Sequence, residues 1–297
     1  MKRIGLVVGA AMLAAIGVSS ASEGQSVQTL GDRIATIEGL AGPESVHWDD
    51  EQAIWFISNF NGDAAGDANG FISKASSGGE LLEREFMVGT DAHPLHGPRG
   101  MRIQGHRLWV ADAQGLHAFD RQSGEHAEFI DFSAFEPGFL NDVEIGPDGA
   151  IYLTDTGNAR LFRIADGKID IVASSGLTSP PNGVVWVPQY EALVLAPWAG
   201  GLEFDGFQPE QQKLVKGPTL PAGGNIDGLE PWQGGLLASS QEDQAIWFVL
   251  KDRAEILIRT EGRPADIGLD PAGHRIAVPY IALDRVDIWR LSEPADR

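Results

Sequence analysis

The chain contains no cysteine among its 297 residues. Disulfide bonds are therefore excluded, and so is a lipid anchor attached to a cysteine side chain. A zinc or copper site with thiolate ligands is excluded for the same reason. Nothing ties the folded chain covalently to itself or to a membrane.

Basic side chains are scarce, with 22 Lys and Arg against 42 Asp and Glu and a formal net charge of −20 at pH 7. Nucleic acids and anionic lipids are bound by basic side chains that neutralise phosphate, so both are poor partners for this chain. Solubility is the simplest interpretation of the acidic surface, and attraction of cations is a second consequence. We expect the partner to be a small-molecule substrate.

Long hydrophobic runs are limited to the first residues, where residues 4–18 are apolar and follow Lys2 and Arg3. The run ends at Ser-Ser-Ala (residues 19–21), which is typical of a signal-peptide cleavage site. It is short for a membrane span, which needs about 20 apolar residues. We therefore expect residues 1–21 to be a signal peptide, residues 22–297 to form a single domain, and the protein to be periplasmic or secreted.

Several catalytic motifs are also missing. The chain has no Gly-x-Ser-x-Gly elbow, no His-Glu-x-x-His pair, no Gly-Lys-Ser/Thr phosphate loop and no Rossmann glycine fingerprint. The mature sequence shows no amphipathic helix of ten or more residues. Serine hydrolases, zinc proteases and nucleotide-binding enzymes lose support, and an all-β fold is expected.

What the chain does have is a repeat in which an oxygen-donor residue precedes a short apolar strand. The four donor segments are Pro43-Glu44-Ser45-Val46, Leu140-Asn141-Asp142-Val143, Pro181-Asn182-Gly183-Val184 and Ile226-Asp227-Gly228-Leu229. Alignment on the apolar position gives six units about 38 to 55 residues apart. Their equivalent residues are Glu44, Arg99, Asn141, Asn182, Asp227 and Ala265.

Each unit contains about four short strands separated by turn residues such as Asp148-Gly149. Units of this length with several strands are typical of propeller blades. The sequence therefore predicts a six-bladed β-propeller with four-stranded blades. The last unit has only three strands, and residues 33–38 have strand character, so we expect the N-terminal strand to join the last blade and close the ring.

The repeat places the donors around one axis, because the innermost strand of each blade runs along the central channel. Two carboxylates and two amide oxygens form an all-oxygen set with a formal charge of about −2, which suits a divalent cation. Glu44, Asn141, Asn182 and Asp227 are therefore the candidate metal ligands, with Ca²⁺ expected and Mg²⁺ or Mn²⁺ as alternatives. The alternative is that these are ordinary turn and strand-start residues, for which Asn and Asp are favoured.

With these motifs, the chain from about residue 42 to residue 291 resembles the gluconolactonase and senescence-marker-protein (regucalcin) lactonases. Paraoxonases and diisopropyl fluorophosphatase are more distant relatives. The resemblance implies that Glu44, Asn182 and Asp227 hold a catalytic divalent metal. It also implies that Asn141 contacts the substrate or the ion, and that Asp227 acts as base or nucleophile. Sugar lactonases carry an arginine where this chain has Phe139.

Three other residues are candidates for the same channel mouth because they lie in or beside the insertion at residues 89–98. Arg99 and His93 are candidates for substrate binding, and His96 is a second candidate for the general base after Asp227. The alternative for both histidines is that they are solvated loop residues.

The leading hypothesis is an exported, metal-dependent hydrolase of a lactone or related ester. In this hypothesis, the cation polarises the carbonyl group and stabilises the developing negative charge. A non-catalytic propeller that binds a ligand or protein at the same mouth is the alternative outside enzymes, because a fold does not fix a function. Phosphotriester hydrolysis is the alternative among enzymes.

Overall fold

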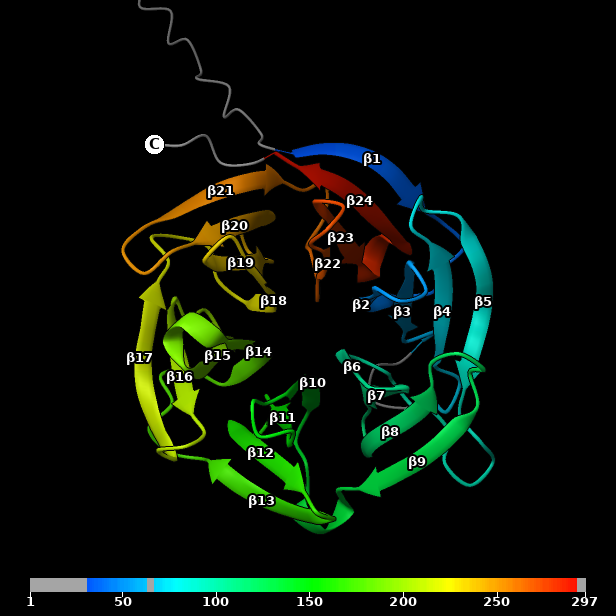
Figure 1. Ribbon diagram of the computed structural model, residues 1–297, viewed down its shortest axis with the longest axis horizontal. Coiled ribbons are helices and arrows are strands. Elements are labelled where there is room, and N and C mark those ends of the chain that lie inside the picture. The colour runs from blue at the N-terminus through cyan, green and yellow to red at the C-terminus, as the bar shows by residue number, and fades with distance from the viewer. Residues whose placement is uncertain (1–30, 63–66, 293–297) are drawn as a thin grey trace, which may run out of the picture.

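The structure is a computed structural model that describes residues 31–62 and 67–292. Six four-stranded antiparallel sheets surround a common axis (Figure 1). The predicted all-β, six-bladed propeller with four-stranded blades is confirmed. The expected signal peptide, residues 1–21, lies outside the described residues, and export stays a prediction.

Blades 1 to 5 each consist of four consecutive strands, the first nearest the axis (Figure 1). Blade 1 contains β2 (Pro43–Asp49), β3 (Ile54–Asn59), β4 (Phe71–Ser76) and β5 (Leu81–Val88). Blade 2 contains β6 (Met101–Gln104), β7 (Arg107–Ala111), β8 (Gly115–Asp120) and β9 (His126–Asp131). Blade 3 contains β10 (Leu140–Ile145), β11 (Ile151–Asp155), β12 (Arg160–Ala165) and β13 (Lys168–Ala173). Blade 4 contains β14 (Pro181–Val187), β15 (Ala192–Pro197), β16 (Glu203–Gln208) and β17 (Lys213–Thr219). Blade 5 contains β18 (Ile226–Trp232), β19 (Gly235–Ser240), β20 (Ala245–Val249) and β21 (Ala254–Arg259).

Blade 6 combines the two ends of the described chain. It contains β22 (Gly268–Asp270), β23 (Arg275–Tyr280), β24 (Arg285–Leu291) and, outermost, β1 (Gly31–Ile37). β1 pairs with β24 in antiparallel orientation from Gly31 opposite Leu291 to Ile37 opposite Val286 (Figure 1). The predicted closure is confirmed, and the N-terminal strand covers the edge that β24 would otherwise expose.

Helical structure in residues 31–62 and 67–292 is limited to three short 3-10 segments, η1 (Ser133–Phe135), η2 (Pro188–Tyr190) and η3 (Ile281–Leu283). Over the same residues, we find no helix with the length and apolar character needed to cross a membrane.

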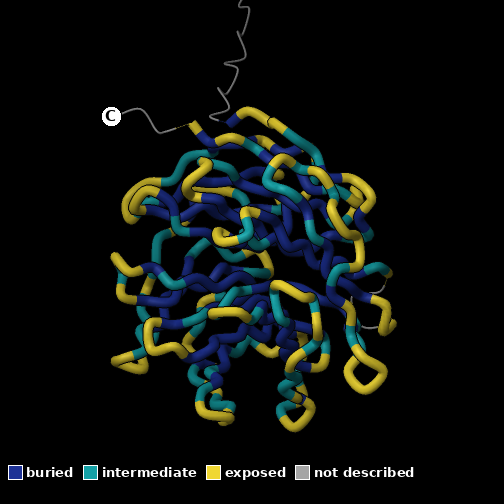
Figure 2. The backbone as a smooth tube through the Cα atoms, turned by 45° about the vertical axis from the view of Figure 1, so that its right-hand side comes forward, coloured by how far each residue is buried: buried dark blue, intermediate teal, exposed yellow. Residues whose placement is uncertain are grey.

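The hydrophobic core is divided among the interfaces between neighbouring blades. Each of six apolar clusters contains side chains from two adjacent blades, such as Val46 and Trp55 of blade 1 with Val286 and Ile288 of blade 6. The inner strands of the blades are largely buried, whereas exposed residues lie in the turns and on outermost strands such as β5 and β1 (Figure 2). Burial of apolar side chains between sheets is therefore what fixes each blade against the next.

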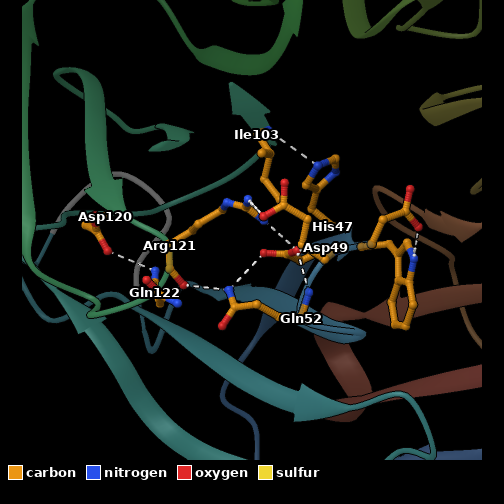
Figure 3. Close-up of polar contacts among 10 residues, drawn as sticks. His47, Asp49, Gln52, Ile103, Asp120, Arg121 and Gln122 are labelled. Carbon is orange, nitrogen blue, oxygen red and sulfur yellow. Dashed lines mark hydrogen bonds and ion pairs between the residues drawn. The ribbon is translucent and has the colours of Figure 1, made fainter. Parts of the chain in front are cut away.

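At the end of the channel where inner strands finish, polar contacts join blades 1 and 2 (Figure 3). Arg121 donates from Nη1 to Asp49 Oδ1 at 2.6 Å, and Gln52 Nε2 donates to the Arg121 carbonyl oxygen at 3.0 Å. Burial raises the pKa of Asp49, but hydrogen bonds from Gln52 and Arg121 outweigh it and hold the pKa below its ordinary value. This end is bridged by charge pairs and differs from the end that carries the donors.

Candidate metal centre

All four donors lie in the same backbone irregularity, a β-bulge at the start of an inner strand. In blade 1, Pro43 pairs with Asn59 and Val46 with Ile57, so three steps along β2 match two steps along β3. The same shift occurs at the start of β10, β14 and β18. A bulge adds one residue to a strand and redirects a side chain. The repeated motif therefore gives each donor the same placement in its blade.

In three of these blades, a hydroxyl group from the second strand accepts a hydrogen bond from a backbone N–H in the bulge. The pairs are Ser45 N–H with Ser58 Oγ at 2.9 Å, Asp142 N–H with Thr154 Oγ1 at 2.9 Å and Gly228 N–H with Ser239 Oγ at 2.8 Å. Thr154 and Ser239 then donate to a carbonyl oxygen of the next blade, at 2.6 and 2.8 Å. Each of these two hydroxyls holds a bulge in shape and also joins neighbouring inner strands.

The glycine after Asn182 allows the inner strands to approach each other closely. A Cβ atom on Gly183 would lie 2.2 Å from the carbonyl oxygen of Asp227 in the next blade. Gly228 is equally restricted, since its Cβ would lie 2.4 Å from the backbone nitrogen of Ile267. The Asn-Gly and Asp-Gly pairs of the sequence are thus explained by the narrow ring that brings the donors together.

The structure brings Glu44, Asn141, Asn182 and Asp227 together around a cavity of about 510 Å³. All four are buried, with Glu44 and Asn141 4% exposed and Asn182 and Asp227 3% exposed. Their convergence follows from the repeat, as the sequence predicts. Their role as metal ligands stays a prediction.

Three buried oxygen atoms of this set accept no hydrogen bond from any described residue: Glu44 Oε2, Asn182 Oδ1 and Asp227 Oδ1. The other groups are already engaged, because Asp227 Oδ2 accepts from Gln241 Nε2 at 2.6 Å and Asn141 Nδ2 donates to Thr156 Oγ1 at 3.1 Å. The second contact leaves the oxygen end of the Asn141 amide for the cavity. Since buried oxygens without partners are costly, a divalent cation fits this donor set.

The charges of the site lead to the same conclusion. Burial raises the pKa of Glu44 well above its ordinary value, and the nearby Asp227 raises it further, while Arg99 opposes the shift. Burial raises the pKa of Asp227 to about 7, against the hydrogen bond from Gln241. Two buried carboxylates close together disfavour each other's charge unless a cation lies between them.

Arg99 and Ala265, the two remaining positions of the ring, supply no oxygen donor. Arg99 is only 1% exposed, donates from Nη1 to Leu140 O at 3.0 Å and lies with its guanidinium 3.8 Å from the centre of the Phe139 ring. Phe139, which contacts this arginine, lines the cavity, whereas Arg99 does not. The charge of Arg99 lowers the pKa of Glu44. A direct substrate contact by Arg99 stays a prediction.

The two histidines of the insertion do not line the cavity. His93 is exposed and stacks on Phe129 of β9, with ring centres 4.7 Å apart. The backbone N–H of His96 donates to Asp112 Oδ1 at 3.0 Å. Leu95, which lies between the two histidines in the sequence, is buried in the apolar cluster of blades 1 and 2. The structure thus brings neither imidazole to the donor set.

A second ring around the cavity is missing from the sequence-based prediction. It is formed by the residue that directly follows the second strand of a blade, because antiparallel strands bring that end to the start of the inner strand. These residues are Phe60, Thr156, Trp198, Gln241 and Ile281, all of which line the cavity, and in blade 2 the equivalent residue is Asp112. Their position relative to the repeat could have identified them, although they share no residue type.

In the described part of the chain, no group of three or more His, Cys, Asp or Glu side chains is arranged to hold a metal ion. The candidate centre is instead a mixed set of two carboxylates and two amides.

Comparison with known proteins supports the fold. The sequence matches no protein-family model and no curated protein. Solved structures of similar shape include a gluconolactonase from Xanthomonas campestris, at 19% identity and a TM-score of 0.64, over 89% of each chain. A streptogramin B lyase has 12% identity and a TM-score of 0.64, over 88% of this chain and 97% of the lyase. The virginiamycin B lyase of Staphylococcus aureus has 14% identity and a TM-score of 0.61, over 86% of this chain and 98% of the lyase. At these identities the likeness establishes a shared six-bladed propeller fold.

Proposed function

We propose that this protein is a metal-dependent hydrolase of a lactone or related carboxylic ester, with Ca²⁺ as the expected cation and Mg²⁺ or Mn²⁺ as alternatives. The observation that carries the proposal is the set of unpaired, buried oxygens on Glu44, Asn182 and Asp227 at one cavity. Solved propellers of similar shape are named as a gluconolactonase and as a streptogramin B lyase, so this fold carries lactonase and lyase activities in other proteins. Export to the periplasm or the medium is part of the same proposal.

A bound divalent cation would polarise the ester carbonyl group and stabilise the negative charge that develops on its oxygen. The protein supplies the remaining steps. Asp227 is a buried carboxylate at the cavity, and in this role it would accept a proton from the attacking water. The water oxygen bonds to the carbonyl carbon, the carbon–alkoxy oxygen bond breaks, and the proton passes to the departing alkoxide.

The neighbours of Asp227 hold it in place for this task. Gln241 Nε2 fixes Oδ2 at 2.6 Å, and the hydrogen bond of Asn141 to Thr156 fixes the orientation of the Asn141 amide. Thr156 is itself held, since its hydroxyl donates to Pro181 O at 2.7 Å. The catalytic geometry therefore depends on short contacts between strand ends of neighbouring blades.

The test is hydrolysis of a panel of lactones, aryl esters and a phosphotriester, with and without chelator, by wild type and by Asp227→Asn. The proposal expects turnover of lactones or esters that chelator abolishes and that the substitution reduces at least about a hundredfold. Reaction in ¹⁸O-labelled water separates hydrolysis, which incorporates the label, from elimination, which does not. Calcium binding without turnover of any substrate would contradict the proposal and identify a binding protein.

A further inference from the structure

The walls above the donor set are apolar on most sides of the cavity. Phe60, Phe139, Trp198 and Ile281 line it together with the four donors. They come from blade 1, the segment before blade 3, blade 4 and blade 6, respectively. A substrate that reaches the donors must therefore pass between hydrophobic side chains from several sides of the ring.

The Thr156 hydroxyl and the Gln241 amide nitrogen on the same wall are already engaged. Thr156 accepts from Asn141 Nδ2 at 3.1 Å and donates to Pro181 O at 2.7 Å. The Gln241 amide nitrogen donates to Asp227 at 2.6 Å. Of these two side chains, only Gln241 keeps a carbonyl oxygen that no contact among the described residues occupies, so a substrate with several hydroxyl groups would give up water for few matched partners, which costs free energy.

Phe139 also packs against Arg99, which is buried and does not line the cavity. Its ring centre lies 3.8 Å from the Arg99 guanidinium, and Phe139 is 37% exposed and lines the cavity. Its backbone is fixed, because Phe139 N–H donates to Asp155 Oδ1 at 2.8 Å and Phe139 O accepts from Thr156 N–H at 2.9 Å. The aromatic surface is therefore held in place by Asp155, which Arg160 in turn holds at 2.6 Å.

From this arrangement we infer that the site takes an uncharged lactone or ester with an alkyl or aryl substituent, which packs between Phe60, Phe139, Trp198 and Ile281. Polyhydroxylated lactones are poor substrates. The inference rests on the proposed function and adds its substrate class. A cavity of about 510 Å³ has room for a lactone ring and a substituent of this kind.

The experiment measures kcat/KM for γ-butyrolactone, γ-hexanolactone and γ-octanolactone, and for δ-gluconolactone against δ-hexanolactone. We expect kcat/KM to rise about threefold for each added methylene group, slightly less than for full burial because the mouth is open. We expect δ-gluconolactone to be at least about tenfold poorer than δ-hexanolactone.

Phe139→Ser should lower kcat/KM for γ-octanolactone about tenfold while changing that for γ-butyrolactone by no more than about twofold. The matched control is Ile171→Ser, because Ile171 is also an exposed hydrophobic residue, 43% exposed, but lies on the outermost strand of blade 3. Ile281→Ser provides a second test of the wall if Phe139→Ser lowers the melting temperature.

Binding of the corresponding lactams, which resist hydrolysis, separates this inference from the proposed function. Hydrolysis with no gain along the alkyl series, or with δ-gluconolactone preferred, would overturn the substrate class and leave the hydrolase proposal intact. Absence of all hydrolysis, with alkyl lactams bound at least tenfold more tightly than pyrrolidinone in a Phe139-dependent manner, would refute the hydrolase and retain an apolar ligand site. Equal lactam binding in wild type and Phe139→Ser, with no hydrolysis, would refute both.

Discussion

Replacing Glu44 with Gln should have opposite effects on the metal-free and the cation-loaded protein. Glu44 Oε2 is buried without a partner among the described residues, and the pKa of Glu44 is raised by burial and by Asp227. In the metal-free protein, Glu44→Gln removes a poorly compensated charge, so the melting temperature should stay the same or rise. In the cation-loaded protein, the same substitution removes a charged ligand, so the melting temperature should fall below that of the loaded wild type.

The magnitude follows from binding linkage. A cation at one hundred times its Kd stabilises the folded state by about 2.7 kcal/mol. For a domain of this size, 1 kcal/mol corresponds to about 2–4 °C, so wild type should gain about 5–10 °C. If the loss of one carboxylate weakens binding about a hundredfold, the same cation concentration stabilises the variant by only about 0.4 kcal/mol, or about 1 °C.

The assay is thermal unfolding of chelator-treated protein with increasing Ca²⁺, Mg²⁺ or Mn²⁺ at constant ionic strength. Glu80→Gln is the matched control, because Glu80 is exposed and its loss removes the same charge from the surface. An equal gain for Glu44→Gln and wild type, or no gain for wild type with any of the three ions, would refute the reasoning.

Three further predictions concern how the site is held. Asp155→Asn should destabilise the fold by about 1.5–3 kcal/mol through its contacts with Arg160 and the loop. Burial raises the pKa of Asp155, but hydrogen bonds from Phe139 and Arg160 outweigh it and hold the pKa in the folded protein below the ordinary value of 3.8. The loss of stability in Asp155→Asn should therefore be complete above pH 3.8 and disappear as the pH falls through the pKa of the folded protein. Urea unfolding from about pH 7 to about pH 2.5 tests this. Gly183→Ala should cost about 1–3 kcal/mol, because the new Cβ would lie 2.2 Å from Asp227 O, and a normal urea midpoint would contradict the close approach. Ser239→Ala should cost about 1–3 kcal/mol, since its hydroxyl accepts from the bulge and donates to the next blade, and Ser123→Ala on an exposed turn is the control.

The fold could be predicted from the sequence because the donor motif marks the same structural position in four of the six units. Its glycine and its apolar residue are required by the narrow ring and by the interface between blades, so both are visible as a pattern. Closure by residues near Arg33 was predictable for a similar reason, since the last unit had one strand too few.

The rest of the site could not be read from residue types. Phe60, Trp198 and Ile281 occupy a position that holds Asp112, Thr156 and Gln241 in the other blades, because no common backbone constraint selects a residue type there. His93 was placed near the mouth by its short distance in sequence from Arg99. Instead, burial of Leu95 and a turn at residues 90–93 direct the His93 ring toward Phe129.

The central claim is that a cation held by Glu44, Asn141, Asn182 and Asp227 is required for hydrolysis of a lactone or ester. The most direct measurement titrates Ca²⁺ into chelator-treated protein and follows bound ion and turnover of γ-octanolactone in the same samples. We predict one ion per chain and turnover that rises in proportion to occupancy, with both requiring about a hundredfold more Ca²⁺ in Glu44→Gln. Full turnover in the presence of chelator, or full occupancy without turnover of any lactone or ester, would contradict it.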